Sequence, residues 1–159
     1  MQKTNRNVII ESEDIQVSIA PDVIKAFKTV QEQGDFRKER GGILAGYYNS
    51  SGNCLVISDI TFPQDKDICS HFRFLRKSQG HQDIMDDLWE QSEHRKSYLG
   101  EWHTHNQQYP VPSHVDTCNW KKISKREHNF DELFFVIVGT DNIGVWCIKQ
   151  GTVLEVDRI

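Results

Sequence analysis

Two histidines and an aspartate are spaced in this sequence so that they could bind one metal ion. His103 and His105 are two residues apart, and Asp116 follows a loop that contains Pro110 and Pro112. Because side chains at i and i+2 of a strand project to the same side, both imidazoles point at one place. The proline-containing loop turns the chain back, and the next helix then offers the carboxylate in its first turn. Two imidazoles and one carboxylate are the three-ligand set of a catalytic zinc site, with a fourth position left for water.

A histidine pair of this kind is a weak signal when it stands alone. One histidine could pack in the core while the other lies on the surface. A serine that caps a helix after a proline-containing loop is also common in proteins without a metal site. The signal here is the conjunction of three features. The pair at 103 and 105 is followed by seven loop residues, by Ser113 as a helix N-cap, and by Asp116 three positions later. That combined spacing favours a metal site over separate structural roles.

The same spacing resembles the JAMM signature of the JAB/MPN metalloproteases. The resemblance implies that His103, His105 and Asp116 bind one Zn²⁺ ion, and that Ser113 helps to hold the reacting carbonyl oxygen. It also implies a single domain over residues 1–159, with a curved mixed β-sheet flanked by helices. The order of apolar segments favours the same fold class, an α+β protein arranged as an α/β sandwich.

The resemblance further implies a glutamate that acts as general base and precedes a glycine-rich apolar strand. Glu39, at the start of the segment Glu39–Gly46, matches that description. Glu101 is a rival, since it lies two residues before His103 and would project to the same side of the strand. Its alternative role is an ion pair or support for a ligand. Many family members have proline after the second histidine, whereas this chain has Asn106, so we expect a changed loop and a retained zinc site.

Other side chains near the motif are weaker candidates. His114 follows the capping serine and is expected on the surface or along the substrate. Cys118 lies two residues past the aspartate and is expected on another face of the helix. Solvated or structurally satisfied histidines are expected at the remaining positions, which are His71, His81, His94 and His128.

The chemistry that the resemblance implies is amide hydrolysis without a covalent intermediate. Glu39 would take a proton from water and deliver it to the leaving amine. Zinc and Ser113 would stabilise the oxyanion of the tetrahedral intermediate. JAB/MPN enzymes are mostly isopeptidases, which cut after a C-terminal tail and release a lysine. The expected partner is therefore a protein substrate with an extended C-terminal tail.

Within the family, the chain is similar to short stand-alone bacterial members. The residues that carry this likeness are Glu39–Gly42, His71–Arg73 and Tyr98–His105. That group resembles the deconjugases of CBASS anti-phage operons, where an E1–E2 fusion enzyme attaches a cGAS-like CD-NTase to targets. The implied reaction removes the CD-NTase.

Three alternatives remain at this point. One is a JAB deconjugase or processing protease for another ubiquitin-like or sulfur-carrier protein, and another is an inactive MPN scaffold. The third is an unrelated metal hydrolase. The sequence argues against this third alternative. An amidohydrolase carries its histidine pair on the first strand of a much longer barrel, which a pair at residue 103 of 159 cannot match, and a metallo-β-lactamase needs an Asp-His pair that Asn106–Gln108 does not supply.

Composition excludes several broad classes. The chain has 159 residues and a formal net charge of −4, which gives no electrostatic reason to bind nucleic acid. Its longest apolar stretch, Leu133–Val138, is far shorter than the roughly 20 residues of a membrane span. The polar segment Met1–Asn7 fits no signal peptide. Four scattered cysteines without a CxxC pair are expected to be reduced thiols in the cytoplasm.

The elements that must position the motif follow from hydrophobic periodicity and turn residues. Helices are expected over 21–34, 78–96 and 113–126, with loops over 63–70 and 106–112. Strands are expected over 7–12, 15–19, 41–48, 54–62, 71–75, 98–103, 133–139, 143–148 and 152–156.

Overall fold

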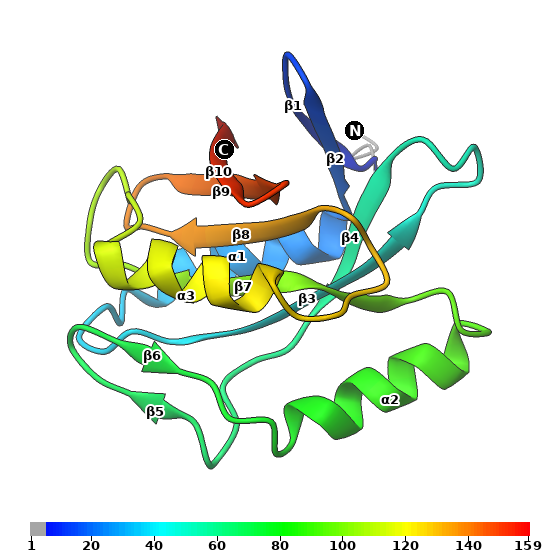
Figure 1. Cartoon of the computed structure of the whole chain (residues 1–159). Coiled ribbons are helices and arrows are strands. Elements are labelled where there is room, and N and C mark those ends of the chain that lie inside the picture. The colour runs from blue at the N-terminus through cyan, green and yellow to red at the C-terminus, as the bar shows by residue number, and fades with distance from the viewer. Residues whose placement is uncertain (1–5) are drawn as a thin grey trace, which may run out of the picture.

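A computed structural model describes residues 6–159 of the chain, so most of the polar segment Met1–Asn7 lies outside the described residues. In this part of the chain an eight-stranded sheet has the order β1-β2-β4-β3-β7-β8-β9-β10, and β5 and β6 form a separate hairpin (Figure 1). The elements are β1 Val8–Ser12, β2 Ile15–Ile19, α1 Pro21–Gln33, β3 Gly41–Tyr48, β4 Leu55–Ile60, β5 Ile68–Cys69, β6 Phe74–Leu75, α2 His81–Gln91, β7 Ser97–Thr104, α3 His114–Ser124, β8 Leu133–Val138, β9 Ile143–Lys149 and β10 Thr152–Arg158. The pairs β2–β4 and β7–β8 are parallel and the others antiparallel, which confirms the predicted mixed sheet.

Helices cover both faces of the sheet, as expected for an α/β sandwich. Figure 1 shows α1 behind the sheet and α3 in front of it. On the α1 side, Phe27 packs edge-on against Trp102, with ring centroids 5.7 Å apart. On the α3 side, Trp120 stacks on Phe135 at 4.7 Å. The third helix, α2, packs against Ile43 of β3. No helix within residues 6–159 is long and apolar enough to cross a bilayer.

The second helix is shorter than its periodicity predicts. The expected span was 78–96, but α2 begins only after Gly80, which has a φ of 81°. Glu93 and His94 then adopt φ values of 54° and 64°, a left-handed conformation that ends helical hydrogen bonding. The prediction was wrong at both ends because periodic apolar residues do not reveal where the backbone leaves the helical region.

The segment between β4 and α2 also differs from the prediction. Part of the expected loop 63–70 is strand β5, and the expected strand 71–75 is reduced to β6. The physical reason is a tight turn, in which the Ser70 N–H donates to the Arg73 carbonyl at 2.9 Å. Asp67 closes the base of this hairpin by accepting the Lys77 N–H at 2.7 Å. The result is a short arm beside the main sheet.

Strand β3 lies very close to β7 where the predicted site begins. Gly41 is paired with His103 in the antiparallel ladder. A Cβ atom at position 41 would collide with the Trp102 carbonyl oxygen and crowd the Phe74 ring. Glycine is therefore required at this position. The close approach brings the preceding residue pair, Glu39 and Arg40, alongside the end of β7.

Candidate metal centre and active site

The two motif histidines lie together at the end of β7. His103 belongs to the strand, and His105 follows directly after it, where its N–H donates to the Val138 carbonyl of β8 at 3.0 Å. The two Nε2 atoms are 3.0 Å apart. Both histidines are buried. The i and i+2 spacing thus has the geometric effect that the sequence predicts.

Asp116 meets both histidines from the first turn of α3. Its Oδ1 atom lies 3.3 Å from His103 Nε2 and its Oδ2 atom lies 3.2 Å from His105 Nε2. Ser113 is the N-cap, as predicted, and its Oγ accepts the Asp116 N–H at 3.1 Å. The Ser113 N–H in turn donates to Asp116 Oδ2 at 2.7 Å. This capping box fixes the direction in which the carboxylate points.

Glu39 approaches the same pair of histidines from the segment before β3. Its Oε1 atom is 3.6 Å from His105 Nε2, and Glu39, His103 and His105 each offer a donor atom within 4.8 Å of the others. The Glu39 N–H donates to the Ser70 carbonyl of the hairpin at 2.7 Å. Burial raises the pKa of the Glu39 carboxyl, and the nearby histidines offset that effect only in part. Glu39 therefore combines proximity with a raised proton affinity.

The other charged groups of the site have shifted proton affinities of their own. Burial alone would raise the pKa of Asp116, but hydrogen bonds with His103 and His105 outweigh it and hold that pKa far below its usual range. For His105 the signs are reversed: burial lowers the pKa of the imidazole, but the hydrogen bond and negative charge of Asp116 outweigh burial, and the net shift of the pKa is upward. The site thus keeps an ionised carboxylate next to imidazoles and favours added positive charge.

The distances among these donors fit a tetrahedral zinc ion. Zinc–ligand bonds of about 2.0–2.1 Å place neighbouring ligands of a tetrahedron about 3.3 Å apart. The two histidine Nε2 atoms are 3.0 Å apart, and each faces its own oxygen of Asp116, His103 at 3.3 Å from Oδ1 and His105 at 3.2 Å from Oδ2. The donor types are also those that zinc prefers. The residues present therefore fit the ion.

Gln107 supports His105 from behind and was not predicted. Its Oε1 atom lies 3.2 Å from His105 Nδ1 and accepts the Val111 N–H at 3.1 Å. An acceptor at Nδ1 keeps the ring proton there, which leaves Nε2 free to face the cluster. The only sequence signal is an amide two residues after the second histidine, and that signal is too general to single out. Asn106, where many family members have proline, does not displace His105 from the cluster.

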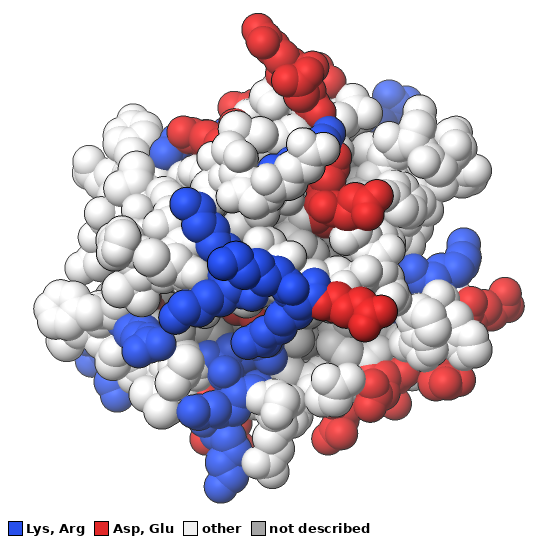
Figure 2. Space-filling view, in the orientation of Figure 1, with Lys and Arg blue, Asp and Glu red and all other residues white. Residues whose placement is uncertain are grey.

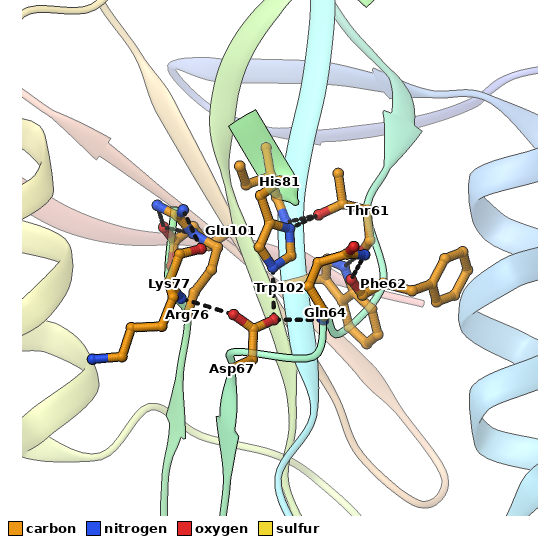
Figure 3. A network of polar contacts seen from close by, with 10 residues as sticks. Thr61, Phe62, Gln64, Asp67, Arg76, Lys77, His81, Glu101 and Trp102 are labelled. Carbon is orange, nitrogen blue, oxygen red and sulfur yellow. Dashed lines mark hydrogen bonds and ion pairs between the residues drawn. The ribbon is translucent and has the colours of Figure 1, made fainter. Parts of the chain in front are cut away.

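Glu101, the rival base, is engaged in an ion pair. Its Oε1 atom lies 2.8 Å from Arg76 Nη2 (Figure 3). The same atom accepts the Tyr98 hydroxyl at 3.1 Å. The side chains of Arg76 and Glu101 are 18% and 14% exposed, so this pair is largely shielded from water. Its structural role is thus the ion pair that was the alternative to catalysis.

The remaining candidates lie outside the cluster of potential ligands found within residues 6–159. His114 and Cys118 are exposed on α3 and contact each other at 3.4 Å. His128 hydrogen-bonds to the Ile123 carbonyl at 2.7 Å. His94 stacks on Trp89, and His71 is exposed beside Phe72.

His81 is fully buried in a polar network that ties three parts of the chain together. Thr61 Oγ1 accepts the Ile43 N–H at 2.7 Å and donates to His81 Nδ1 at 2.7 Å. The opposite ring nitrogen then donates to Asp67 at 2.6 Å (Figure 3). Burial raises the pKa of Asp67, but hydrogen bonds from Gln64, from Lys77 and from the histidine outweigh it and lower the pKa below its usual value. The network fixes the hairpin against the sheet.

Comparison with known proteins places this geometry in a family. Residues 24–150 match the prokaryotic homologs of the JAB domain. Three curated relatives are each named CD-NTase/cGAS isopeptidase. The one from Escherichia coli is 34% identical over 73% of this chain and 73% of its own. The one from Vibrio cholerae is 31% identical over 72% of each chain, and the one from Pseudomonas aeruginosa is 31% identical over 83% of this chain and 84% of its own.

Solved structures with low sequence identity share the fold. A Desulfitobacterium hafniense protein superposes with a TM-score of 0.59 at 17% identity, covering 86% of this chain and 87% of that one. A Salinibacter ruber protein superposes with a TM-score of 0.50 at 14% identity, covering 87% and 88%. These likenesses concern the fold alone. The match over residues 24–150 and the three relatives carry the assignment: the chain belongs to the family of prokaryotic homologs of the JAB domain.

Proposed function

We propose that this protein is a zinc-dependent isopeptidase that removes a conjugated CD-NTase from its targets in CBASS anti-phage defence. The observation that carries the proposal is the meeting of His103, His105 and Asp116 within 3.0–3.3 Å, with Glu39 beside them. The name isopeptidase on all three curated relatives supports the reaction class, and the first part of that name supports the substrate.

In this proposal His103, His105 and Asp116 hold the zinc ion. A bound zinc ion lowers the pKa of water and polarises a carbonyl group. Glu39 accepts a proton from the attacking water and passes it to the leaving amine, and its raised pKa suits both steps. The Ser113 hydroxyl oxygen accepts the Asp116 N–H, so its own hydrogen remains available for the oxygen of the scissile carbonyl.

The balance of the reaction is simple hydrolysis. Water adds to the carbonyl carbon of the isopeptide bond, the C–N bond breaks, and the amine leaves with the proton that Glu39 carried. The products are a free C-terminal carboxylate on the tail and a free lysine on the target. No covalent link to the chain forms, because water and not a side chain attacks the carbonyl carbon.

The proposed partner is a protein conjugated through an extended C-terminal tail by an E1–E2 fusion enzyme. We place the reaction in the cytoplasm, which is supported by four free cysteines among the described residues. We also propose that residues 1–159 act as one domain. The second candidate is a JAB protease for another ubiquitin-like or sulfur-carrier tail, which would use the same residues. An inactive scaffold is disfavoured because the full set of His, Asp, Ser and Glu side chains is present.

A cleavage assay tests this proposal. The purified protein is incubated with a CD-NTase joined through its C-terminus to a lysine of a carrier protein, and with a ubiquitin-like protein joined in the same way. We expect release of the CD-NTase with an intact C-terminus. Preferential cleavage of the ubiquitin-like conjugate would support the second candidate, and cleavage of neither would contradict both.

A further inference from the structure

A groove leads away from the proposed metal centre between α3 and β6. It has a volume of about 160 Å³, and Asp116 and Arg126, from opposite ends of the α3 segment, both line it. Arg73 and Arg76 line it from the hairpin side. Because Asp116 belongs to both, the groove lies next to the proposed metal centre.

The charges in this groove do not balance. Its two carboxylates are already paired, since Asp116 contacts both motif histidines and Glu101 is paired with Arg76 at 2.8 Å. Within residues 6–159, neither Arg73 nor Arg126 lies within 4.0 Å of a carboxylate, and both are exposed. Two guanidinium groups are therefore left to face an incoming ligand.

The surrounding surface has the same sign. Figure 2 shows Lys and Arg side chains gathered over the C-terminal half of α3 and continuing toward the hairpin, with acidic atoms against the edge of this cluster and more of them over α2. Lys121 and Lys122 lie in the last turn of α3. This positive band stands out on a chain whose formal net charge is −4. Such a field attracts a negatively charged segment and repels a basic one.

The shape of the groove fits an extended peptide. Strand β6 pairs with β5 alone among the strands of the described residues, and the backbone N–H of Phe74 in β6 donates to the Glu39 carboxylate of the site. The helix rises about 12 Å from Asp116 to Ser124, which an extended chain covers in about four residues. The isopeptide bond joins a C-terminal tail to a lysine side chain. A single lysine side chain does not need a groove of this length, so the groove suits the tail.

From these observations we propose that the groove selects a tail with acidic side chains within about four residues of the scissile amide, bound by Arg73 and Arg126. This inference rests on the proposed isopeptidase function and specifies its substrate class. Val115, which is 55% exposed and also lines the groove, offers an apolar contact to the same segment.

The test uses three fluorogenic substrates that differ only in charge. Each has a short tail joined through its terminal carboxyl to the ε-amine of lysine, with Glu, Gln or Lys at the third and fourth residues before the scissile amide. For the zinc-loaded protein we expect kcat/KM to fall in the order Glu, Gln, Lys. Exposed ion pairs predict a step of about threefold to tenfold between Glu and Gln.

Charge reversal provides the decisive comparison. The double variant R73E/R126E should invert the order, so that the Lys tail becomes the best substrate, and R73Q/R126Q should flatten it. The control K25E/K28E makes the same change in net charge on exposed residues of α1 and should keep the wild-type order.

The outcomes separate the two proposals. Equal cleavage of all three tails by the wild-type protein would overturn this inference and leave the isopeptidase function standing. An order that R73E/R126E leaves unchanged would also overturn it. Cleavage of none of the three would contradict the proposed function, and this inference would fall with it.

Discussion

Thr104 and Arg40 are joined by two hydrogen bonds that connect the histidine strand to the glutamate segment. The Arg40 N–H donates to Thr104 Oγ1 at 3.0 Å, and the Thr104 N–H donates to the Arg40 carbonyl at 2.8 Å. Thr104 lies between the two motif histidines, and Arg40 follows Glu39 directly. The residue between the proposed ligands therefore positions the proposed base.

Loss of the Thr104 hydroxyl should reduce turnover without removing zinc. In Thr104→Val the Arg40 N–H loses its acceptor at a largely buried position, and the Glu39 segment is less firmly held. We expect kcat to fall about tenfold, in line with about 1–3 kcal/mol for an unsatisfied buried donor. Single-turnover kinetics and zinc content measure the two effects. Thr104→Ser keeps the acceptor and should retain most of the activity, whereas equal loss in both variants would contradict this role.

Glu39→Gln should separate catalysis from metal binding. The amide cannot accept the proton from water, so we expect kcat to fall by about 10²–10⁴-fold. Zinc content should stay at the wild-type level, because Glu39 is proposed as a base and not as a ligand. Loss of zinc in this variant would instead make Glu39 a ligand. A wild-type cleavage rate would exclude it as the base.

Gln107→Ala should weaken zinc binding. Removal of its Oε1 leaves His105 Nδ1 without its acceptor and lets the ring rotate. Removal of the hydrogen-bond partner of a metal-binding histidine lowers metal affinity by about 10–100-fold. Competition with a fluorescent chelator measures the zinc dissociation constant. Gln108→Ala, a change at the neighbouring exposed residue, is the matched control, and an equal effect in both variants would count against the assigned role.

Asp67→Asn should destabilise the fold in a way that depends on pH. The pKa of Asp67 is lower in the folded protein than its ordinary value of 3.8, so its contribution is complete above that value. This stabilising contribution disappears as the pH falls from 3.8 toward the lower pKa of Asp67 in the folded protein. We expect the variant to lose about 1–3 kcal/mol of unfolding free energy at neutral pH.

Urea unfolding at several pH values checks this expectation. The difference between wild type and Asp67→Asn should shrink as the pH falls below 3.8. Asp65→Asn, an exposed neighbour, serves as the control and should change little. A difference that is constant with pH would mean that the buried carboxylate is not the source of the effect.

The sequence predicts the sheet and the motif well because both depend on local spacing. Alternation at the end of β7 and in the residue directly after it directs His103 and His105 to one side, and the N-cap signal at Ser113 places Asp116 in the first helical turn. The order of strands and helices is enough to identify the layers.

The contacts that hold the site in place are absent from the prediction because they join residues far apart in the chain. The bond between Thr104 and Arg40 crosses 64 positions. Asp67 and His81, 14 positions apart, meet only once the hairpin folds, and no local pattern marks either residue. The same holds for α2, whose ends depend on the backbone conformations of Gly80 and His94 and not on periodicity.

The central claim is that His103, His105 and Asp116 together hold one zinc ion. Its most direct test is the zinc content of the purified protein, measured by mass spectrometry for wild type, His103→Ala and Glu39→Gln. The account predicts one zinc per chain in wild type and in Glu39→Gln, and almost none in His103→Ala. One zinc per chain in a folded His103→Ala variant would contradict it.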